Sequence, residues 1–253
     1  DKQFKRKKKQ AKTQKIKDNT SNCTQECIKS PRLSKKEQLR IQRQRLLNIL
    51  EKETDVKGGN EKGSNLLQIC IDFQFGERMT DKELSRLASQ VCRVYGANKS
   101  SEHPAKLSFV NLDEKGRTFQ VCCAKNAGFD KYLVHRTSKG IMEEYNSVID
   151  RLVYLTPDSS IPLEDLELDK VYVIGGFVDD TVQKNVTLNY AGENKISTAR
   201  LPIKEHCSKS EEKGSFKQIL TINQVFEILQ KFIECKNWAT AITNGIPQRT
   251  GFK

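Results

Sequence analysis

Four loops carry the residues whose types and order could build a ligand site. Each loop accompanies a short apolar segment with the length of a buried strand, and in open α/β sheets ligands bind outside the carboxyl ends of the strands. In the second loop, Gly175-Gly176 would let a backbone approach a ligand closely, although such a pair also fits an ordinary turn. Asp179 and Asp180 follow as carboxylates that could accept a proton. The four loops span residues 154–159, 174–180, 199–203 and 218–227.

Several common active-site chemistries lack their motifs in this sequence. There is no G-x-G-x-x-G, no G-x-x-x-x-G-K-[ST] and no G-x-S-x-G, which argues against a dinucleotide fold, a P-loop and a serine-hydrolase elbow. The 8 cysteines include no C-x-x-C pair, so we expect no zinc site or disulfide framework and interpret most of them as small core residues. Adjacent Cys122 and Cys123 would point to opposite faces of a predicted strand.

The apolar pattern predicts the elements that must position these loops. Capping-box spacings at 34–37, 80–83 and 221–224 mark the starts of three helices with apolar residues at helical intervals. The order of the elements predicts an α/β domain with a mainly parallel central sheet. The expected strands are 66–72, 106–112, 118–123, 151–155, 171–174, 201–203 and 218–220, while 125–144 is ambiguous.

The positive charge is concentrated at one end of the chain. The 253 residues include 44 basic and 32 acidic side chains, and residues 1–50 hold 16 of the basic and 4 of the acidic ones, which leaves 28 of each in the remainder. A neutral body of this size is long enough to bury a core. We expect a basic disordered tail over residues 1–33, a basic amphipathic helix with a linker over residues 34–65, and one domain over residues 66–253.

Nothing in the sequence predicts a membrane protein. The longest apolar runs are strand-sized, and the start has no apolar region typical of a secretory signal. The cluster Lys5–Lys9 fits an RNA-binding tail, a nuclear-localisation signal or a solvated tail. We therefore expect the protein in the nucleus, the cytosol or both.

The four loops in this order resemble the catalytic half of the tRNA guanosine-9 N1-methyltransferase family. Residues 90–99 (QVCRVYGANK) and the ending Trp238…Ile246-Pro247-Gln248-Arg249 share in the resemblance, which covers residues 68–253. The family belongs to the SPOUT superfamily, whose trefoil-knotted α/β fold binds S-adenosylmethionine. The basic N-terminal extension also matches, and the chain is most similar to a non-mitochondrial vertebrate paralogue, the B form.

The resemblance implies where the cofactor and the catalytic carboxylate lie. Asp179, which follows Gly-Gly-x-Val, matches the catalytic position, with Asp180 as the competing carboxylate. S-adenosylmethionine would lie across the loops, leave as S-adenosylhomocysteine and need no metal. Leu155, Leu201 and Leu220 also fit ordinary core positions. The implied cofactor-binding residues are Leu155, Gly175, Asp179, Asp180, Thr181, Val182, Gln183, Thr187, Leu201, Gln218, Ile219 and Leu220.

The implied reaction gives a carboxylate two possible roles. Guanine N1 carries a proton at neutral pH, and Asp179 could accept that proton as the methyl group arrives. Alternatively, Asp179 could orient the base and stabilise developing charge. The sequence leaves both roles open, and it leaves open whether adenosine at position 9 is accepted as well.

The expected partner is tRNA, bound mainly through its phosphates by the basic tail and helix. Lys99 stands where the family usually has Arg, so the charge is kept but the planar fork is lost. We expect a monomer, with no DNA or membrane partner. The residues expected to contact RNA are Arg40, Arg43, Gln90, Arg93, Asn98 and Lys99, beside the Lys5–Lys9 cluster.

Two other functions fit the same sequence. The protein could be a catalytically weak or inactive tRNA-binding module that has kept the fold. It could also be a subunit of an RNA-processing complex, as suggested by the mitochondrial paralogue. Affinity for S-adenosylmethionine would separate a methyltransferase from a protein that only binds RNA.

Overall fold

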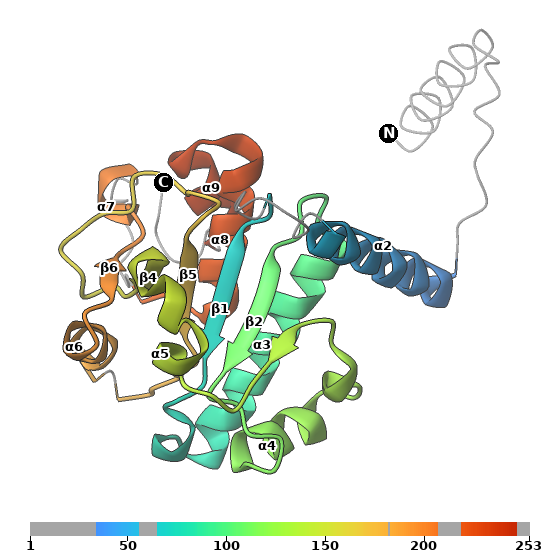
Figure 1. The fold of residues 1–253 in the computed structure, drawn as a ribbon, viewed down its shortest axis with the longest axis horizontal. Coiled ribbons are helices and arrows are strands. Elements are labelled where there is room, and N and C mark those ends of the chain that lie inside the picture. Colours follow the sequence, from blue (N-terminus) through green and yellow to red (C-terminus); the bar gives the residue numbers. More distant parts are fainter. Residues whose placement is uncertain (1–33, 56–64, 182, 207–218, 247–253) are drawn as a thin grey trace, which may run out of the picture. The chain divides into compact units, whose positions relative to one another are not determined.

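The structure, a computed structural model, describes residues 34–55, 65–181, 183–206 and 219–246 (Figure 1). The chain divides into two units, residues 1–39 and 40–253. In the first unit the described residues begin helix α2 (Lys35–Asp55), and the capping box expected there is present. The Ser34 N–H donates to Glu37 Oε2 (2.9 Å), and the Glu37 N–H donates to Ser34 Oγ (3.3 Å). The predicted tail and most of the predicted linker lie outside the described residues.

The second unit is built on a sheet of six parallel strands in the order β3-β2-β1-β5-β4-β6. The predicted α/β domain with a mainly parallel sheet is thereby confirmed. Central strand β1 pairs with β2 on one side and β5 on the other, and this register sets Asp72 opposite Gly175 at the carboxyl ends. The strands are β1 (Gln68–Asp72), β2 (Lys106–Val110), β3 (His135–Arg136), β4 (Leu152–Leu155), β5 (Val171–Gly175) and β6 (Ser197–Ala199).

Helices pack on both faces of the sheet, which explains why the strands are apolar along their whole length. In β1, Ile69 and Ile71 face a large core shared with α3, α4, α8 and α9, whereas Cys70 faces a smaller core shared with α5 and α6. None of the described helices is both long and apolar enough to cross a membrane. Besides α2, the α-helices are α3 (Asp81–Ser100), α4 (Arg117–Lys125), α5 (Ile141–Glu144), α6 (Val186–Glu193), α7 (Ile203–His206), α8 (Ile222–Cys235) and α9 (Trp238–Gly245); the 3₁₀ helices are η1 (Gly76–Arg78), η2 (Phe129–Lys131) and η3 (Asn146–Arg151).

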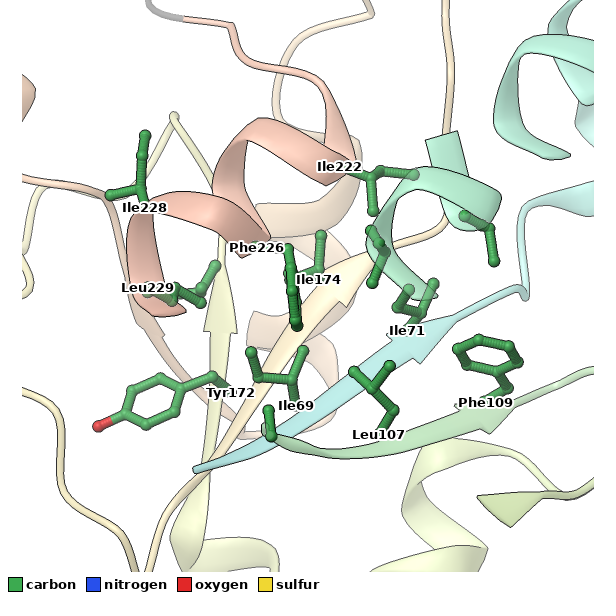
Figure 2. Close-up of a cluster of buried hydrophobic side chains, with 14 of the residues drawn as sticks. Ile69, Ile71, Leu107, Phe109, Tyr172, Ile174, Ile222, Phe226, Ile228 and Leu229 are labelled. Atoms are coloured by element: carbon green, nitrogen blue, oxygen red, sulfur yellow. The ribbon is translucent and has the colours of Figure 1, made fainter. Parts of the chain in front are cut away.

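The large core lies between the sheet and helix α8 (Figure 2). Phe226 reaches from α8 toward Ile174 of β5 and Ile69 of β1, and all three side chains are buried. Alternate strand residues point into this core because side chains of a strand alternate between its faces. This packing holds α8 against the sheet.

The other two predicted capping boxes are also present, and they begin the helices that flank the predicted site. At the start of α3, the Thr80 N–H donates to Glu83 Oε2 (2.8 Å) and the Glu83 N–H donates to Thr80 Oγ1 (3.3 Å). At the start of α8, the Thr221 N–H donates to Gln224 Oε1 (2.9 Å). Each box satisfies backbone donors that the first turn of a helix leaves unpaired.

Three predicted strands are not strands in the described residues. Residues 118–123 lie in helix α4, where Thr118, Phe119 and Cys122 are buried together on one face at helical spacing. Cys122 and Cys123 are therefore neighbours on a helix and do not face opposite sides of a strand. Residues 201–203 form no strand either, because Pro202 has no N–H to donate to a neighbouring strand and Ile203 already begins α7. Ile219 and Leu220 have no regular structure, and Gln218 lies outside the described residues.

Candidate functional site

A cavity of about 830 Å³ opens beside the carboxyl ends of β4 and β5. Its size falls within the usual range of roughly 300–1,000 Å³ for small-molecule sites. The loops after β4, β5 and β6 meet there because parallel strands end at the same edge of the sheet, and Ile219 and Leu220, just before α8, complete the lining. The cavity lining includes nine of the residues predicted to bind a cofactor: Leu155, Gly175, Asp179, Asp180, Gln183, Thr187, Leu201, Ile219 and Leu220.

The remaining cofactor predictions have different outcomes. Thr181 is exposed and does not line the cavity, but it lies in the same loop and donates hydrogen bonds to Asp179. Val182 and Gln218 lie outside the described residues. Leu155 is buried and lines the cavity at the same time, so the two interpretations of this position, core and ligand contact, are compatible.

Gly176 is required by the close approach of β5 to β1. Its N–H donates to the backbone oxygen of Asp72 (2.7 Å), and a Cβ at this position would lie 2.8 Å from that same oxygen. Any side chain would therefore push the strand ends apart. Gly176 thus serves strand packing, and it lies where the chain leaves β5 toward Asp179.

The Asp179 carboxylate orders the loop that follows it. Oδ1 accepts hydrogen bonds from the Thr181 N–H (2.7 Å) and the Thr181 hydroxyl (2.6 Å), and Oδ2 accepts one from the Gln183 N–H (2.5 Å). The side chain is half-buried in the cavity wall. These donors stabilise the ionised carboxylate and fix its direction, so Asp179 is a preorganised acceptor at the edge of the cavity.

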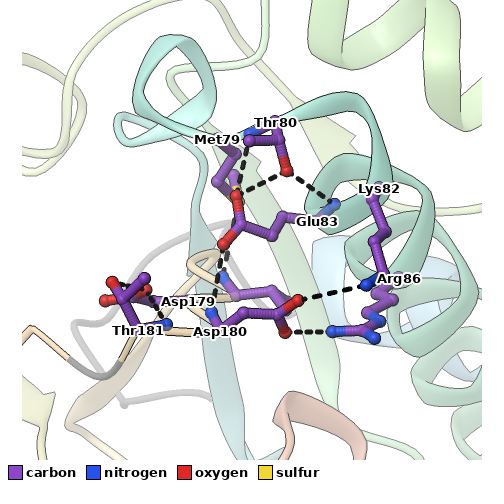
Figure 3. Close-up of polar contacts among 9 residues, drawn as sticks. Met79, Thr80, Lys82, Glu83, Arg86, Asp179, Asp180 and Thr181 are labelled. Atoms are coloured by element: carbon purple, nitrogen blue, oxygen red, sulfur yellow. Dashed lines mark hydrogen bonds and ion pairs between the residues drawn. The ribbon is translucent and has the colours of Figure 1, made fainter.

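Asp180 points toward helix α3 (Figure 3). Its carboxylate forms an ion pair with Arg86 and a longer one with Lys82 (3.8 Å), and the side chain is 42% exposed. These cations compete with any ligand for the Asp180 oxygens. Both carboxylates line the cavity, but Asp180 is turned toward α3, whereas Asp179 accepts hydrogen bonds from its own loop.

The sequence analysis missed several residues of the cavity lining. Thr156, Pro157 and Asp158 follow β4 directly, and Arg200 follows β6. Arg200 donates two hydrogen bonds to Glu205 of α7 (2.9 and 2.6 Å), which lower the pKa of Glu205 and hold α7 against the cavity. Their positions at strand ends could have indicated these four residues, since all of them lie in the predicted loops.

A buried carboxylate beneath the site was also missed. Asp72 ends β1 with no exposed surface and accepts hydrogen bonds from Asn111 Nδ2 (2.7 Å), Gln74 Nε2 (2.8 Å) and the Tyr154 hydroxyl (3.2 Å). Burial raises the pKa of Asp72, while these donors oppose the rise. The network joins the ends of β1, β2 and β4 next to Gly176. It can therefore affect the cavity by fixing the positions of these strand ends.

The raised pKa makes a prediction for Asp72→Asn. An unfolded Asp has a pKa of about 3.9. Because the pKa of Asp72 is higher in the folded protein, the unfolded chain ionises more readily. The free energy of unfolding therefore falls as pH rises from the unfolded-state pKa to the folded-state pKa. From pH 4 to 7 we expect the unfolding free energy of the wild type to fall relative to that of the variant, by at most about 1.4 kcal/mol per pH unit. Urea denaturation across this range measures the difference, and a relative gain by the wild type would contradict the prediction.

The residues predicted to bind RNA divide between the surface and the interior. Arg40 and Arg93 are exposed, and Lys99 lies over the Tyr95 ring, 5.8 Å from its centre. Arg43 is exposed as well, with Nη1 donating to the Lys131 backbone oxygen (2.9 Å). These four cations remain available to phosphates.

Gln90 and Asn98 do not fit their predicted role as RNA contacts. Gln90 is 9% exposed, and its Oε1 accepts the Ile222 N–H at the start of α8 (2.9 Å). Asn98 is 1% exposed and binds both the N–H and the carbonyl oxygen of Ala105 (2.7 and 2.9 Å). Both amides are held by backbone groups, so they stabilise the fold around α3.

Comparison with known proteins assigns the family. A family model described as tRNA (guanine(9)-N(1))-methyltransferase TRM10/TRM10A matches residues 1–251. The chain belongs to this family. The relatives confirm the prediction that the chain is most similar to the B form of this family. It is 41% identical over 186 residues to tRNA methyltransferase 10 homolog B of Bos taurus, and 32% identical over 188 residues to homolog A of Mus musculus.

The aligned regions cover 73% of this chain in both cases, but only 58% of the bovine and 54% of the mouse protein. The chain therefore spans less than two thirds of the length of these TRM10 relatives. The crystal structure of full-length spTrm10 in complex with SAH is 36% identical and superposes with a TM-score of 0.64 over 72% of this chain and 95% of that one. The predicted SPOUT-type α/β fold is thereby confirmed.

Proposed function

We propose that this protein transfers the methyl group of S-adenosylmethionine to N1 of the purine at position 9 of tRNA. The acceptor would be guanosine, with adenosine as a possible second substrate, and the other product would be S-adenosylhomocysteine. The observation that carries the proposal is one cavity whose lining includes nine predicted cofactor positions, Asp179 among them. Membership of the TRM10 family and the SAH bound in spTrm10 support the same assignment.

The cavity residues fit an adenosine-containing cofactor. Leu155, Leu201 and Leu220 supply apolar surface for a flat base, and polar groups of Thr156 and Thr187 lie on the same wall. The Thr187 hydroxyl donates to Thr156 Oγ1 (2.9 Å), so both side chains are held in place. When bound, the cofactor supplies a methyl group that is already activated, so the protein's task is to position the acceptor and to manage its proton.

Asp179 is the group that would handle the proton of guanine N1. Its carboxylate is held at the cavity edge by three donors from its own loop. In this state it can accept a hydrogen bond from N1–H and orient the guanine. The same hydrogen bond is the path along which the N1 proton could pass to the carboxylate as the methyl group arrives.

Primer extension on purified tRNA tests the proposed function. N1 methylation blocks base pairing, so reverse transcriptase should stop beside position 9 after tRNA has been incubated with the protein and S-adenosylmethionine. Reactions without the cofactor are the control. If no new stop appears on any tRNA tried, the protein is not a position-9 methyltransferase, and a role limited to tRNA binding replaces the proposal.

We propose that the tail strengthens tRNA binding without selecting a sequence. Residues 1–33 carry 11 basic and 3 acidic side chains. They can be removed without touching the part of α2 in which Leu46 is buried and Arg45 Nη2 donates to the Glu102 backbone oxygen (2.9 Å). Phosphate contacts release counterions, with a slope of about 0.7–0.9 per contact in a plot of log K against log salt.

Deleting residues 1–33 should therefore weaken tRNA binding and flatten its salt dependence, while cofactor affinity stays unchanged. Filter binding of tRNA between about 50 and 200 mM salt measures the slope. Calorimetry with S-adenosylmethionine is the control for an intact cavity. An unchanged salt slope would show that the tail does not contact the tRNA backbone.

We also propose that the protein acts as a monomer in the nucleus or the cytosol. The Lys5–Lys9 cluster supports nuclear entry, because short basic runs serve as import signals. Sedimentation velocity of the protein alone and with tRNA tests the monomer, and imaging of a fluorescent fusion with and without the cluster tests the location.

A further inference from the structure

Glu83 makes hydrogen bonds in two directions from the first turn of α3 (Figure 3). Oε2 accepts the N–H and the hydroxyl of Thr80 (both 2.8 Å), which completes the capping box. Oε1 accepts the backbone N–H of Asp180 (3.0 Å), which lies 97 residues further along the chain. The side chain is only 9% exposed. A single carboxylate thus caps a helix and binds the residue that follows Asp179.

The same end of α3 holds the backbone before Asp179. The Val178 N–H donates to Met79 Sδ (3.4 Å), so the amides on both sides of Asp179 bind two residues four positions apart, one just before α3 and one in its first turn. Further along the loop, Arg78 Nη2 donates to Gln183 Oε1 (2.9 Å). The direction of the Asp179 side chain depends on these contacts, because the backbone from which it projects has no strand or helix of its own.

We propose that Glu83 is a positioning residue for methyl transfer, whose Oε1 fixes the Asp180 backbone and thereby directs the Asp179 carboxylate toward the cavity. This inference rests on the proposed function, in which Asp179 handles the proton of the purine. The role differs from capping, because Thr80 and Oε2 form the cap and Oε1 forms the link to the loop.

The negative charge of Glu83 supports its role as a positioning residue. Hydrogen bonds from the Asp180 N–H and from Thr80 hold the pKa of Glu83 below its ordinary value, so the acceptor is ionised at neutral pH. Bonds to an ionised acceptor are roughly twice as strong as neutral ones. Glu83 is therefore a stronger anchor for the loop than a neutral side chain would be.

Two substitutions separate the link from the cap. Thr80→Ala removes the hydroxyl of the capping box and leaves Oε1 opposite the Asp180 N–H. Glu83→Ala removes the capping carboxylate and the link together. Glu37→Ala is the matched control, since Glu37 closes the equivalent box on Ser34 at the start of α2. All three variants lose a cap, but only Glu83→Ala loses the Asp180 acceptor.

The readout is the single-turnover rate of position-9 methylation by the full chain, at saturating tRNA and S-adenosylmethionine. We expect a roughly tenfold to hundredfold lower rate for Glu83→Ala, because a small misplacement of a reacting group has effects of this size. Thr80→Ala and Glu37→Ala should stay within about twofold of the wild type, even where their melting temperatures fall. Equal rates for Thr80→Ala and Glu83→Ala would overturn the proposal.

Hydrogen exchange of the Asp180 amide, followed by NMR, tests the link independently of activity. The amide should be protected in the wild type and in Thr80→Ala, and should exchange faster in Glu83→Ala. If Glu83→Ala does not fold, Glu83→Gln serves instead: with its oxygen on Thr80, as Gln224 has on Thr221, its NH₂ group faces the Asp180 N–H. Unchanged protection, or lost protection with a full rate, would overturn the proposal. A wild type that methylates no tRNA would refute the proposed function, while the exchange data would still decide whether Glu83 holds the loop.

Discussion

Changing Asp179 to Asn is expected to lower the single-turnover rate of methyl transfer by roughly 10²- to 10⁴-fold, the usual contribution of a positioned acid or base. The amide oxygen can still accept from Thr181, but its NH₂ group would face the Gln183 N–H, which now donates to Oδ2. The variant therefore loses one bond within the loop and the negative charge beside the purine. Because the leucine walls of the cavity do not change, cofactor affinity should stay within a few-fold of the wild type.

Asp180→Asn is the matched control for this experiment. It makes the same change at the adjacent position, where the carboxylate is paired with Arg86 and Lys82. We expect less than about a tenfold loss, since an exposed pair of this kind contributes about 1 kcal/mol or less. Primer extension measures the rates and calorimetry measures cofactor affinity. A larger loss for Asp180→Asn than for Asp179→Asn would reverse the assignment of the two carboxylates.

The same variants separate proton acceptance from orientation. If Asp179 takes the proton of N1, the wild-type rate should rise with pH and then level off, and this rise should disappear in Asp179→Asn. If Asp179 only orients the purine, the variant should be slower but keep the pH dependence of the wild type. The three donors to the carboxylate favour orientation in the described conformation, because they favour the ionised form over the protonated one.

Local patterns in the sequence predicted the helix starts and the parallel sheet that position the site. The three capping boxes could be predicted because each depends only on two residues three positions apart. The parallel sheet followed from apolar runs that are buried on both faces, as Ile69 and Cys70 show on opposite sides of β1. The convergence of the loops after β4, β5 and β6 then followed from the sheet, since parallel strands end at one edge.

Contacts between distant residues could not be predicted in this way. Asp72 was visible as a carboxylate at a strand end, but its burial depends on Asn111 and Tyr154 from neighbouring strands. The bond from Asp180 to Glu83 joins positions 97 residues apart, and nothing in either segment indicates it. Thr118–Cys123 has the composition of a strand, yet packing against α3 and the sheet makes it a helix. Tertiary contacts outweighed local preference there.

Helix α8 takes part in both the core and the candidate site, because one side of it packs in the core and another side lines the cavity. Phe226 has no exposed surface and packs between β1 and β5 (Figure 2). Its neighbour Val225 is half-buried and lines the cavity. Adjacent residues of a helix point about 100° apart, so a single turn can serve both purposes. Stability and ligand affinity should therefore be separable by substitutions at two consecutive positions.

Phe226→Ala should lower the free energy of unfolding by roughly 3–5 kcal/mol, the cost of removing a fully buried aromatic ring and leaving a cavity. Val225→Ala removes two methylene equivalents from the cavity wall, at about 0.8 kcal/mol each, and should weaken cofactor binding by about tenfold. Its effect on unfolding should be the smaller of the two. Urea denaturation and calorimetry with S-adenosylmethionine measure both quantities for each variant. If Val225→Ala unfolds as readily as Phe226→Ala while binding the cofactor normally, then Val225 serves the core and the cavity wall lies elsewhere. If only its affinity falls, α8 both holds the sheet together and contributes to the ligand site through its second face.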